Sequence, residues 1–120
     1  IWEAINLTPY KLRDWTARKE LQGNAPLLHI YAEFEGERPE TEVVESALHA
    51  RMKEVDSFYG DLESMLGVRP MRVTMLPAGT FDRLYEYRRE RGYDLTRRIP
   101  PRTNPTDEDI EDLLKMASQP

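Results

Sequence analysis

Three arginines lie close together near the C-terminal end of the chain, in the segment GYDLTRRIPPR at residues 92–102. Arg97, Arg98 and Arg102 share this segment with one acid and two adjacent prolines, although the whole chain carries a formal charge of −5. Guanidinium groups bind phosphate and carboxylate oxygens through paired hydrogen bonds. The segment is therefore a candidate phosphate-binding or catalytic loop. The alternative is a basic surface loop, because exposed arginines are common and contribute little energy.

Few other side chains form a pattern with known chemistry. His29 and His49 do not occur in a metal-binding spacing such as HExxH, and we expect both to be structural. The chain has no cysteine, which excludes thiol nucleophiles and thiolate metal sites. The acidic run at 107–112 is typical of a helix N-terminus with a solvated face, so we predict no metal site. Three tyrosines near the arginines are expected to pack in the core and at its rim: Tyr85, Tyr87 and Tyr93.

The composition indicates a soluble globular protein. The chain has 120 residues, of which 39% are hydrophobic and 32% are charged, and this length supports one domain with one core. No apolar run approaches the roughly 18 residues of a membrane-spanning helix, and there is no secretory signal pattern. The net negative charge disfavours nucleic acid as a partner. We therefore expect a cytoplasmic protein that binds neither nucleic acid nor membrane.

The first residue is Ile1 rather than methionine, so we expect the chain to be a piece of a longer protein. Residues 1–11 are predicted to be a connecting segment. No internal repeat or low-complexity run divides the remainder, and residues 1–120 are predicted to form a single domain.

Three segments alternate apolar and polar residues with the period of a β-strand: 12–19, 27–34 and 70–76. The second of them, LLHIYAEF, is the clearest. A turn cluster, QGNAP at 22–26, separates the first two segments. The sequence therefore predicts a β-hairpin followed later by a third strand.

Apolar residues recur at helical spacing between Thr41 and Leu66. This stretch is longer than a typical helix, and Asp56 interrupts it with a side chain that favours helix N-caps. We predict two helices broken near Asp56, with one bent helix as the alternative. Gly67 is the expected end, because glycine tolerates the left-handed conformation that terminates many helices.

Two further helices are predicted nearer the C-terminus. Thr80 and Thr106 precede them and are expected to act as N-caps. The first of these helices is expected to bury Phe81, Leu84 and Tyr85. The predicted apolar face of the second is Ile110, Leu113, Leu114 and Ala117.

The order strand, strand, broken helix, strand, helix, helix is typical of an α+β fold. We expect a small, partly antiparallel three-stranded sheet with helices packed against it, on one side of the sheet. Composition, periodicity and spacing do not by themselves indicate a function.

Three short motifs, taken in order, resemble those of one enzyme family: DSFY at 56–59, LPAGTF at 76–81 and RRIPPR at 97–102. Together with LLHIYAEF they are similar to the C-terminal domain of the auxin-responsive Gretchen Hagen family. Its members are acyl-acid amido synthetases of the adenylate-forming superfamily. The resemblance covers about residues 27–114, and loosely the whole chain.

The resemblance implies a mobile, lid-type C-terminal domain of a larger ligase. A large N-terminal domain would bind ATP with magnesium and a small carboxylic acid, and would form an acyl-adenylate. An amine, usually an amino acid, would then attack to give an amide. The expected partners of this chain are that N-terminal domain and these substrates, and the piece alone is expected to be inactive and to bind no cofactor.

The resemblance also implies a role for the arginine segment. The family has a catalytic lysine in this loop, whereas no lysine lies between Lys53 and Lys115 in this chain. Aligned on Ile99 and the following proline, Arg98 takes the place of the lysine; aligned on the second proline, Ile99 does. Arg98 is thus the candidate catalytic residue, and Arg97 and Arg102 are candidate phosphate or domain-interface contacts.

Two other functions remain open. One is a non-catalytic ligand- or partner-binding domain. The other is the C-terminal domain of a phenylacetate-type CoA ligase, which shares the adenylation step but uses a thiol acceptor. Within the motifs, Tyr59, Gly79 and Phe81 are expected to be structural, with Gly79 permitting the turn before the helix.

Overall fold

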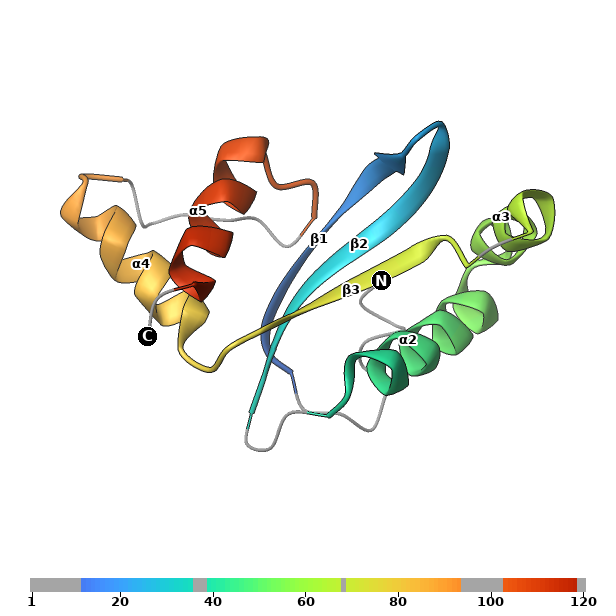
Figure 1. The fold of residues 1–120 in the computed structure, drawn as a ribbon, viewed down its shortest axis with the longest axis horizontal. Helices are drawn as coiled ribbons and strands as arrows, with labels where there is room; N and C mark the ends of the chain where they lie inside the picture. The colour runs from blue at the N-terminus through green and yellow to red at the C-terminus, as the bar shows by residue number, and fades with distance from the viewer. Residues whose placement is uncertain (1–11, 36–38, 68, 94–102, 119–120) are drawn as a thin grey trace.

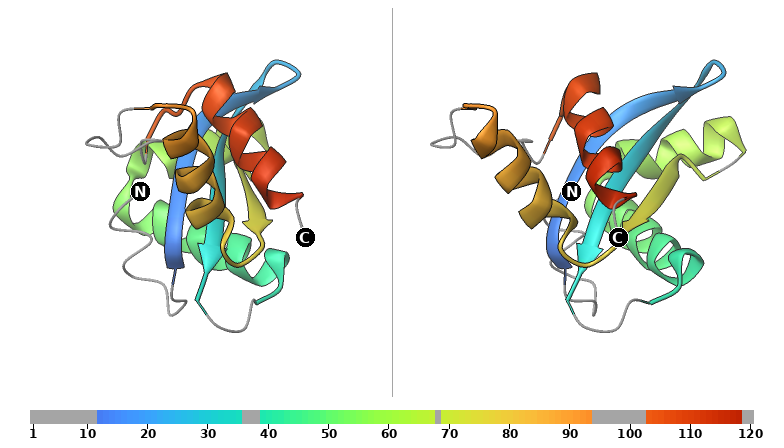
Figure 2. Two further views of the ribbon diagram at one scale, coloured as in Figure 1. Left: turned by 90° about the vertical axis from the view of Figure 1, so that its left-hand side faces the viewer. Right: turned by 60° about the vertical axis from the view of Figure 1, so that its left-hand side comes forward.

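The computed structural model describes residues 12–35, 39–67, 69–93 and 103–118. In this part of the chain a three-stranded sheet lies between two pairs of helices (Figure 1, Figure 2). The elements follow one another as strand, strand, two helices, strand and two helices, as the sequence predicts. The structure therefore confirms a small α+β domain.

The sheet combines an antiparallel hairpin with one parallel strand. Strand β1 spans Leu12–Gln22, β2 spans Ala25–Phe34 and β3 spans Met71–Leu76, in the order β1-β2-β3. β1 is antiparallel to β2, and β3 is parallel to β2. The tight turn of the hairpin places Gly23 at φ 63°, which glycine adopts without strain. The predicted hairpin is confirmed, with β1 extending beyond the predicted end at residue 19.

The broken helix forms the crossover between the two parallel strands. Helix α2 spans Thr41–Val55 and α3 spans Ser57–Leu66. The Asp56 carboxylate accepts hydrogen bonds from the backbone N–H groups of Phe58 and Tyr59, which begins the second helix. Gly67 ends it at φ 71°. The predicted break at Asp56 and the predicted end at Gly67 are both confirmed.

Helices cover both faces of the sheet, so the expectation of helices on one side only is wrong. Helices α2 and α3 lie on one face, and α4, spanning Thr80–Glu90, and α5, spanning Asp107–Ala117, lie on the other (Figure 1). β2 contributes to both layers because successive side chains of a strand point to opposite faces. Its nearly continuous apolar sequence is typical of a strand buried on both sides.

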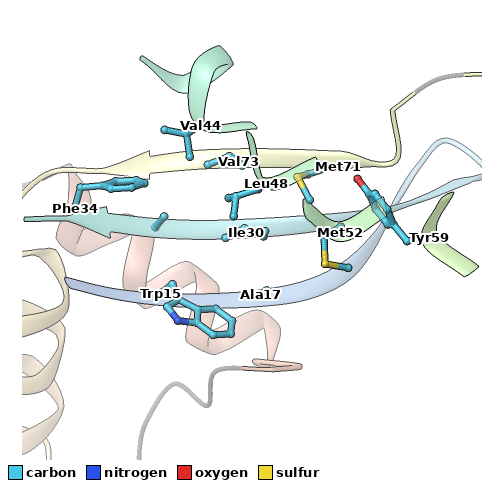
Figure 3. Packing of buried hydrophobic residues seen from close by; sticks show 11 residues of the cluster. Trp15, Ala17, Ile30, Phe34, Val44, Leu48, Met52, Tyr59, Met71 and Val73 are labelled. Carbon is cyan, nitrogen blue, oxygen red and sulfur yellow. The ribbon is translucent and has the colours of Figure 1, made fainter. Parts of the chain in front are cut away.

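The two apolar clusters on either side of the sheet are here named the first core and the second core. The first core, beneath α2 and α3, is drawn in Figure 3. It consists of Trp15, Ala17, Ile30, Ala32, Phe34, Val44, Leu48, Met52, Tyr59, Met71 and Val73. The second core, beneath α4 and α5, consists of Tyr31, Leu76, Phe81, Leu84, Ile110, Leu113 and Met116.

Two predicted buried faces need correction. Tyr85 is 48% exposed, and Arg88 takes its place on the buried side of α4 at 1% exposure. Leu114 is 42% exposed, whereas Met116 is buried. Both errors have the same reason: the helical period allows two neighbouring stripes, and the position of the partner helix decides which stripe is buried.

Thr80 is not the N-cap of α4, which corrects a second expectation. The N-cap is Gly79 at φ 86°, and its neighbour Thr80 is the first helical residue, fully buried. The hydroxyl of Thr80 donates to the carbonyl oxygen of Pro77 at 2.6 Å and accepts from the Arg83 side chain at 3.4 Å. It does not accept from a backbone N–H of the helix as an N-cap would. Thr106, in contrast, does cap α5, in a reciprocal capping box with Asp109.

None of the helices in the described part of the chain has the length and apolar character needed to cross a membrane.

Candidate functional site

The three predicted site residues, Arg97, Arg98 and Arg102, lie outside the described residues. The structure does describe both ends of the chain from which this segment extends. Tyr93, the second residue of the segment, is its last described residue, and Thr103 is the first residue after it. The contacts of these two ends therefore define the setting of the candidate site.

The first end is held through Arg88, a buried cation between α4 and α5. One guanidinium nitrogen donates to Asp109 at 2.7 Å and another donates to Asp112 at 2.9 Å. Burial disfavours the charged guanidinium, but the two carboxylates outweigh it, and the pKa of Arg88 is raised. Its Nε has no hydrogen-bond partner among the described residues. Arg88 therefore joins the two helices through buried ion pairs.

Tyr93 is attached to the same arginine. Its backbone N–H donates to the carbonyl oxygen of Arg88 at 3.0 Å, and its ring lies under the Arg88 guanidinium at 4.8 Å. Its hydroxyl donates to the carboxylate of Glu108 in the first turn of α5. The described start of the arginine segment is thus bound to both helices.

The second end is attached to the outer edge of the sheet. Thr103 forms a parallel bridge with Ala17 of β1, and the N–H of Asn104 donates to the Ala17 carbonyl oxygen at 3.0 Å. Arg18 of β1 then donates to Asp107 at the start of α5 at 2.6 Å. The two ends of the segment are consequently fixed relative to each other through α4, α5 and β1.

A polar network lies beside this second end, on the sheet face that α4 and α5 cover. The Glu20 carboxylate accepts from Arg18 at 2.8 Å, from the Tyr31 hydroxyl at 2.8 Å and from the Nδ1–H of His29 at 2.8 Å. A carboxylate can only accept, so the Nε2 of neutral His29 accepts from the Thr74 hydroxyl at 2.6 Å. His29 also stacks on the Tyr31 ring. This histidine is structural, as predicted.

The network shifts the ionisation of its members. Burial opposes the charge on Glu20, but the hydrogen bonds from Arg18, His29 and Tyr31 outweigh it and lower the pKa of Glu20 to about 2. Burial also lowers the pKa of His29, more than its bond to Glu20 raises it. Burial and the neighbouring Glu20 raise the pKa of Tyr31. At neutral pH Glu20 is ionised, and His29 and Tyr31 are uncharged.

Another carboxylate, the fully buried Glu33, supplies the cap that α4 lacks at its own N-cap residue. Its oxygens accept from the N–H of Gly79 at 3.0 Å and from the N–H of Phe81 at 2.9 Å. Glu33 has no exposed surface, and the Nε of Arg13 lies 3.3 Å from it. A carboxylate at a helix N-terminus is stabilised by the helix dipole. β2 therefore orients α4, and through α4 the first end of the arginine segment.

His49 is also structural, on the opposite side of the sheet. Its Nε2 lies 2.6 Å from a Glu63 oxygen and its Nδ1 lies 2.7 Å from the Tyr59 hydroxyl. Lys53 pairs with the other Glu63 oxygen at 2.8 Å. These contacts tie α2 to α3. Among the described residues, no group of three or more His, Asp or Glu side chains has an arrangement that could hold a metal ion.

Sequence reasoning missed the residues that organise the site. Arg88 is hidden in the basic run of α4, and the pattern around Asp109 and Asp112 predicts a solvated acidic face. Two features of the sequence could have pointed to these residues. Arg88 follows Leu84 by one helical turn, which places it on the apolar face, and Glu33 is an acid inside an apolar strand. Their partners lie 21 to 48 residues away, which no local pattern reveals.

Comparison with known proteins adds a family to this geometry. A family model described as the GH3 family C-terminal domain matches residues 2–97. No curated protein sequence matches the chain. Among solved structures, a "GH3.15 acyl acid amido synthetase" has a TM-score of 0.66 at 19% identity and covers 93% of this chain. An "AtGH3.15 acyl acid amido synthetase in complex with 2,4-DB" gives the same score and identity over 90% of the chain.

The match is to one part of a longer protein, because this chain covers only 20% of each of those solved chains. At 19% identity the solved structures show a shared fold. The family model matches most of the chain, from the beginning of the sequence through the end of α4 and into the arginine segment. The chain therefore belongs to the GH3 family and corresponds to its C-terminal domain.

Proposed function

We propose that this chain is the mobile C-terminal domain of an ATP-dependent acyl-acid amido synthetase. Such an enzyme converts a carboxylic acid to an acyl-adenylate with release of pyrophosphate, and then forms an amide with an amine or amino acid. The observation that supports this proposal is the family match over residues 2–97, together with the fold shared with an acyl acid amido synthetase. ATP, Mg²⁺ and both substrates would bind through a large N-terminal domain, and the cytoplasm is the proposed location.

The proposed role of the arginine segment is to place a cation beside the forming adenylate. Arg98 would offset the negative charge that develops on the carboxylate and phosphate oxygens, and Arg97 and Arg102 would contact phosphate or the large domain. Closure of the two domains would exclude water that hydrolyses the adenylate. The fixed ends at Tyr93 and Thr103 support this role, because they restrict the volume that the segment can reach.

The decisive variant is Arg98→Ala in the full-length enzyme. We expect ATP–pyrophosphate exchange to slow by about 10²–10³-fold, the usual effect of removing one group that stabilises developing charge. Amide formation from a supplied acyl-adenylate should change much less, because the adenylation charge is absent from that step. Arg89→Ala is the matched control, since Arg89 is an exposed arginine at the end of α4 that pairs only with Glu86 among the described residues. Unchanged exchange in the Arg98 variant would contradict the proposed role.

A second candidate is a non-catalytic ligand- or partner-binding domain, which the absence of lysine between Lys53 and Lys115 favours. The first discriminating measurement is the intact mass of the native protein. A mass well above 14.1 kDa is required by the synthetase proposal, whereas a mass near 14.1 kDa favours the binding domain. A CoA-ligase relative would be recognised by product analysis, because its acceptor is a thiol rather than an amine.

A further inference from the structure

Helix α3 presents apolar side chains on two sides. Tyr59 points into the first core and is 7% exposed. Phe58 and Met65 point away from it and are 83% and 81% exposed. With Leu62 between them, they follow the i, i+4, i+7 spacing of a single helical stripe. An apolar stripe on a helix normally faces a packed surface.

Only a small part of α3 is buried against the first core, although several of its residues are apolar. α3 has ten residues, of which only Tyr59 is buried. Isolated helices of this length are marginal in water, and protein helices take most of their stability from packing. The outer stripe of α3 therefore has the character of a helix face that a further surface covers.

An apolar pocket of about 420 Å³ lies beside this stripe. It is bordered by Phe58 and Leu62 on α3, and Met52 and Leu28 lie on the side of the first core. Figure 3 shows Met52 and Tyr59 at the same end of that core. The wall of the pocket is mainly apolar. The pocket therefore suits an apolar side chain, as do the pockets that receive anchor residues at protein interfaces.

Two charged residues also border the pocket, Lys19 and Asp56. The Asp56 carboxylate is occupied by the N–H groups that begin α3. Lys19 forms no ion pair with any residue in the described part of the chain. A small-molecule site usually has several convergent polar groups, whereas the described border of this pocket offers a single unpaired cation. An apolar lining with one cation is complementary to the surface of another protein domain that is apolar and carries an acidic side chain opposite Lys19.

We propose that the α3 stripe and its pocket form the surface on which the large domain of the same polypeptide docks. This proposal rests on the proposed function and names the surface through which the two domains meet. The choice of partner follows from size: the solved synthetases are about five times as long as this chain, so most of the protein that could cover the stripe lies outside it. An apolar side chain of the large domain would enter the pocket, and a carboxylate would face Lys19.

Photo-cross-linking in the full-length enzyme tests the proposal directly. Phe58→p-benzoylphenylalanine places a cross-linking ring on the stripe, and Tyr85→p-benzoylphenylalanine is the matched control on the opposite face of the sheet, where Tyr85 is 48% exposed. Both variants are irradiated without substrates and with ATP plus a carboxylic acid, and the products are mapped by mass spectrometry. We expect position 58 to attach to the large domain at least fivefold more than position 85 in one of these states. Equal yields, or cross-links only between two copies, would overturn the proposal.

A second measurement separates this surface from the proposed chemistry. Phe58→Asp should slow amide formation at least tenfold, whereas Tyr85→Asp should change it less than twofold. Cross-linking from position 58 combined with unchanged exchange in Arg98→Ala supports the docking surface and contradicts the proposed role of Arg98. Loss of exchange in Arg98→Ala without cross-linking from position 58 has the opposite meaning. It supports the proposed role of Arg98 and contradicts the proposed docking surface.

Discussion

At the scale of single residues, two charged side chains are almost completely buried in the part of the chain that the structure describes, and both act at helix ends or between helices. Glu33 binds the N-terminus of α4, and Arg88 joins α4 to α5. Buried charges are tolerated only when hydrogen bonds and opposite charges replace the lost water. Each of these side chains meets that requirement with partners from a different element, and each therefore fixes the orientation of one element relative to another.

We predict that Arg88→Met destabilises the domain by about 3–5 kcal/mol, because it leaves the buried Asp109 and the partly buried Asp112 without a cation. Urea unfolding of the purified chain measures the loss. Arg89→Met, at the next position but exposed, should change the free energy of unfolding by no more than about 0.5 kcal/mol. Replacing both aspartates by asparagine in the Arg88→Met background should recover part of the loss. A loss equal to that of the Arg89 variant would contradict the assignment.

The network around His29 predicts loss of stability in acid. The folded-state pKa of His29 lies below its ordinary value, so as the pH falls below about 6.5 the unfolded chain takes up a proton that the folded chain does not. The pKa of Glu20 falls from 4.5 to about 2, so a second loss occurs as the pH falls from 4.5 towards 2. Both stabilising contributions are fully present above pH 7. The groups that face His29 are Glu20, Thr74, Tyr31, Arg18 and Arg72.

Urea unfolding at pH 7.5, 5.5 and 3.5 tests this prediction. His29→Gln removes the titrating ring and should flatten the step between pH 7.5 and 5.5, while the step below pH 4.5 remains. A wild-type chain with equal stability at pH 7.5 and 5.5 would show that His29 titrates normally.

At the scale of elements, caps decide where helices begin and how they are divided. α5 has a capping box between Thr106 and Asp109, α3 has a side-chain cap from Asp56, and α4 has a cap supplied from another element. The first two are local and visible in the sequence. The third, from Glu33, is a tertiary contact, which is why the local pattern pointed wrongly to Thr80.

We predict that Asp56→Ala destabilises the domain by about 1 kcal/mol, because two N–H groups of α3 lose their acceptor. Asp56→Asn should retain most of the stability, since asparagine caps helices about as well. Asp61→Ala, on an exposed position of α3 without a capping role, is the control for charge. Denaturation midpoints in urea decide the outcome, and equal losses for the Asp56 and Asp61 alanine variants would contradict the cap.

At the scale of the whole molecule, one strand supports two cores. β2 lies at the centre of the sheet, and its alternating side chains pack against α2 and α3 on one face and α4 and α5 on the other. The described ends of the arginine segment adjoin α4 and α5, on one face of the sheet. The α3 stripe lies on the other face. The surfaces proposed for chemistry and for docking are thus held by a common sheet.

Because the cores share β2, we predict a single cooperative unfolding transition. Leu48→Ala in the first core and Leu113→Ala in the second should each cost about 2–5 kcal/mol, since both side chains are fully buried. The double variant should be additive within about 0.5 kcal/mol, because the two leucines belong to separate clusters. Tryptophan fluorescence and far-ultraviolet circular dichroism, followed in urea, should report the same midpoint. Separate midpoints would show that the two layers unfold independently.

The sequence by itself determined the features that depend on neighbours along the chain. The hairpin turn, the helix break at Asp56, the end at Gly67 and the cap at Thr106 all follow from interactions over a few residues, and the structure confirms each. The three short motifs were sufficient to indicate the family. The structural roles of His29 and His49 were also predicted, because neither belonged to a pattern with known chemistry.

Only the tertiary structure decided which faces are buried and which charges are paired. Periodicity shows that a helix has an apolar stripe, but the partner element determines whether Tyr85 or Arg88, and Leu114 or Met116, turns inward. The pairs that hold the molecule together join residues 21 to 89 positions apart: Arg88 with Asp109, Glu33 with Phe81 and Arg18 with Asp107. Such contacts form only after folding has brought the two groups together, and their energy depends on distances in space and on burial, which local sequence does not specify.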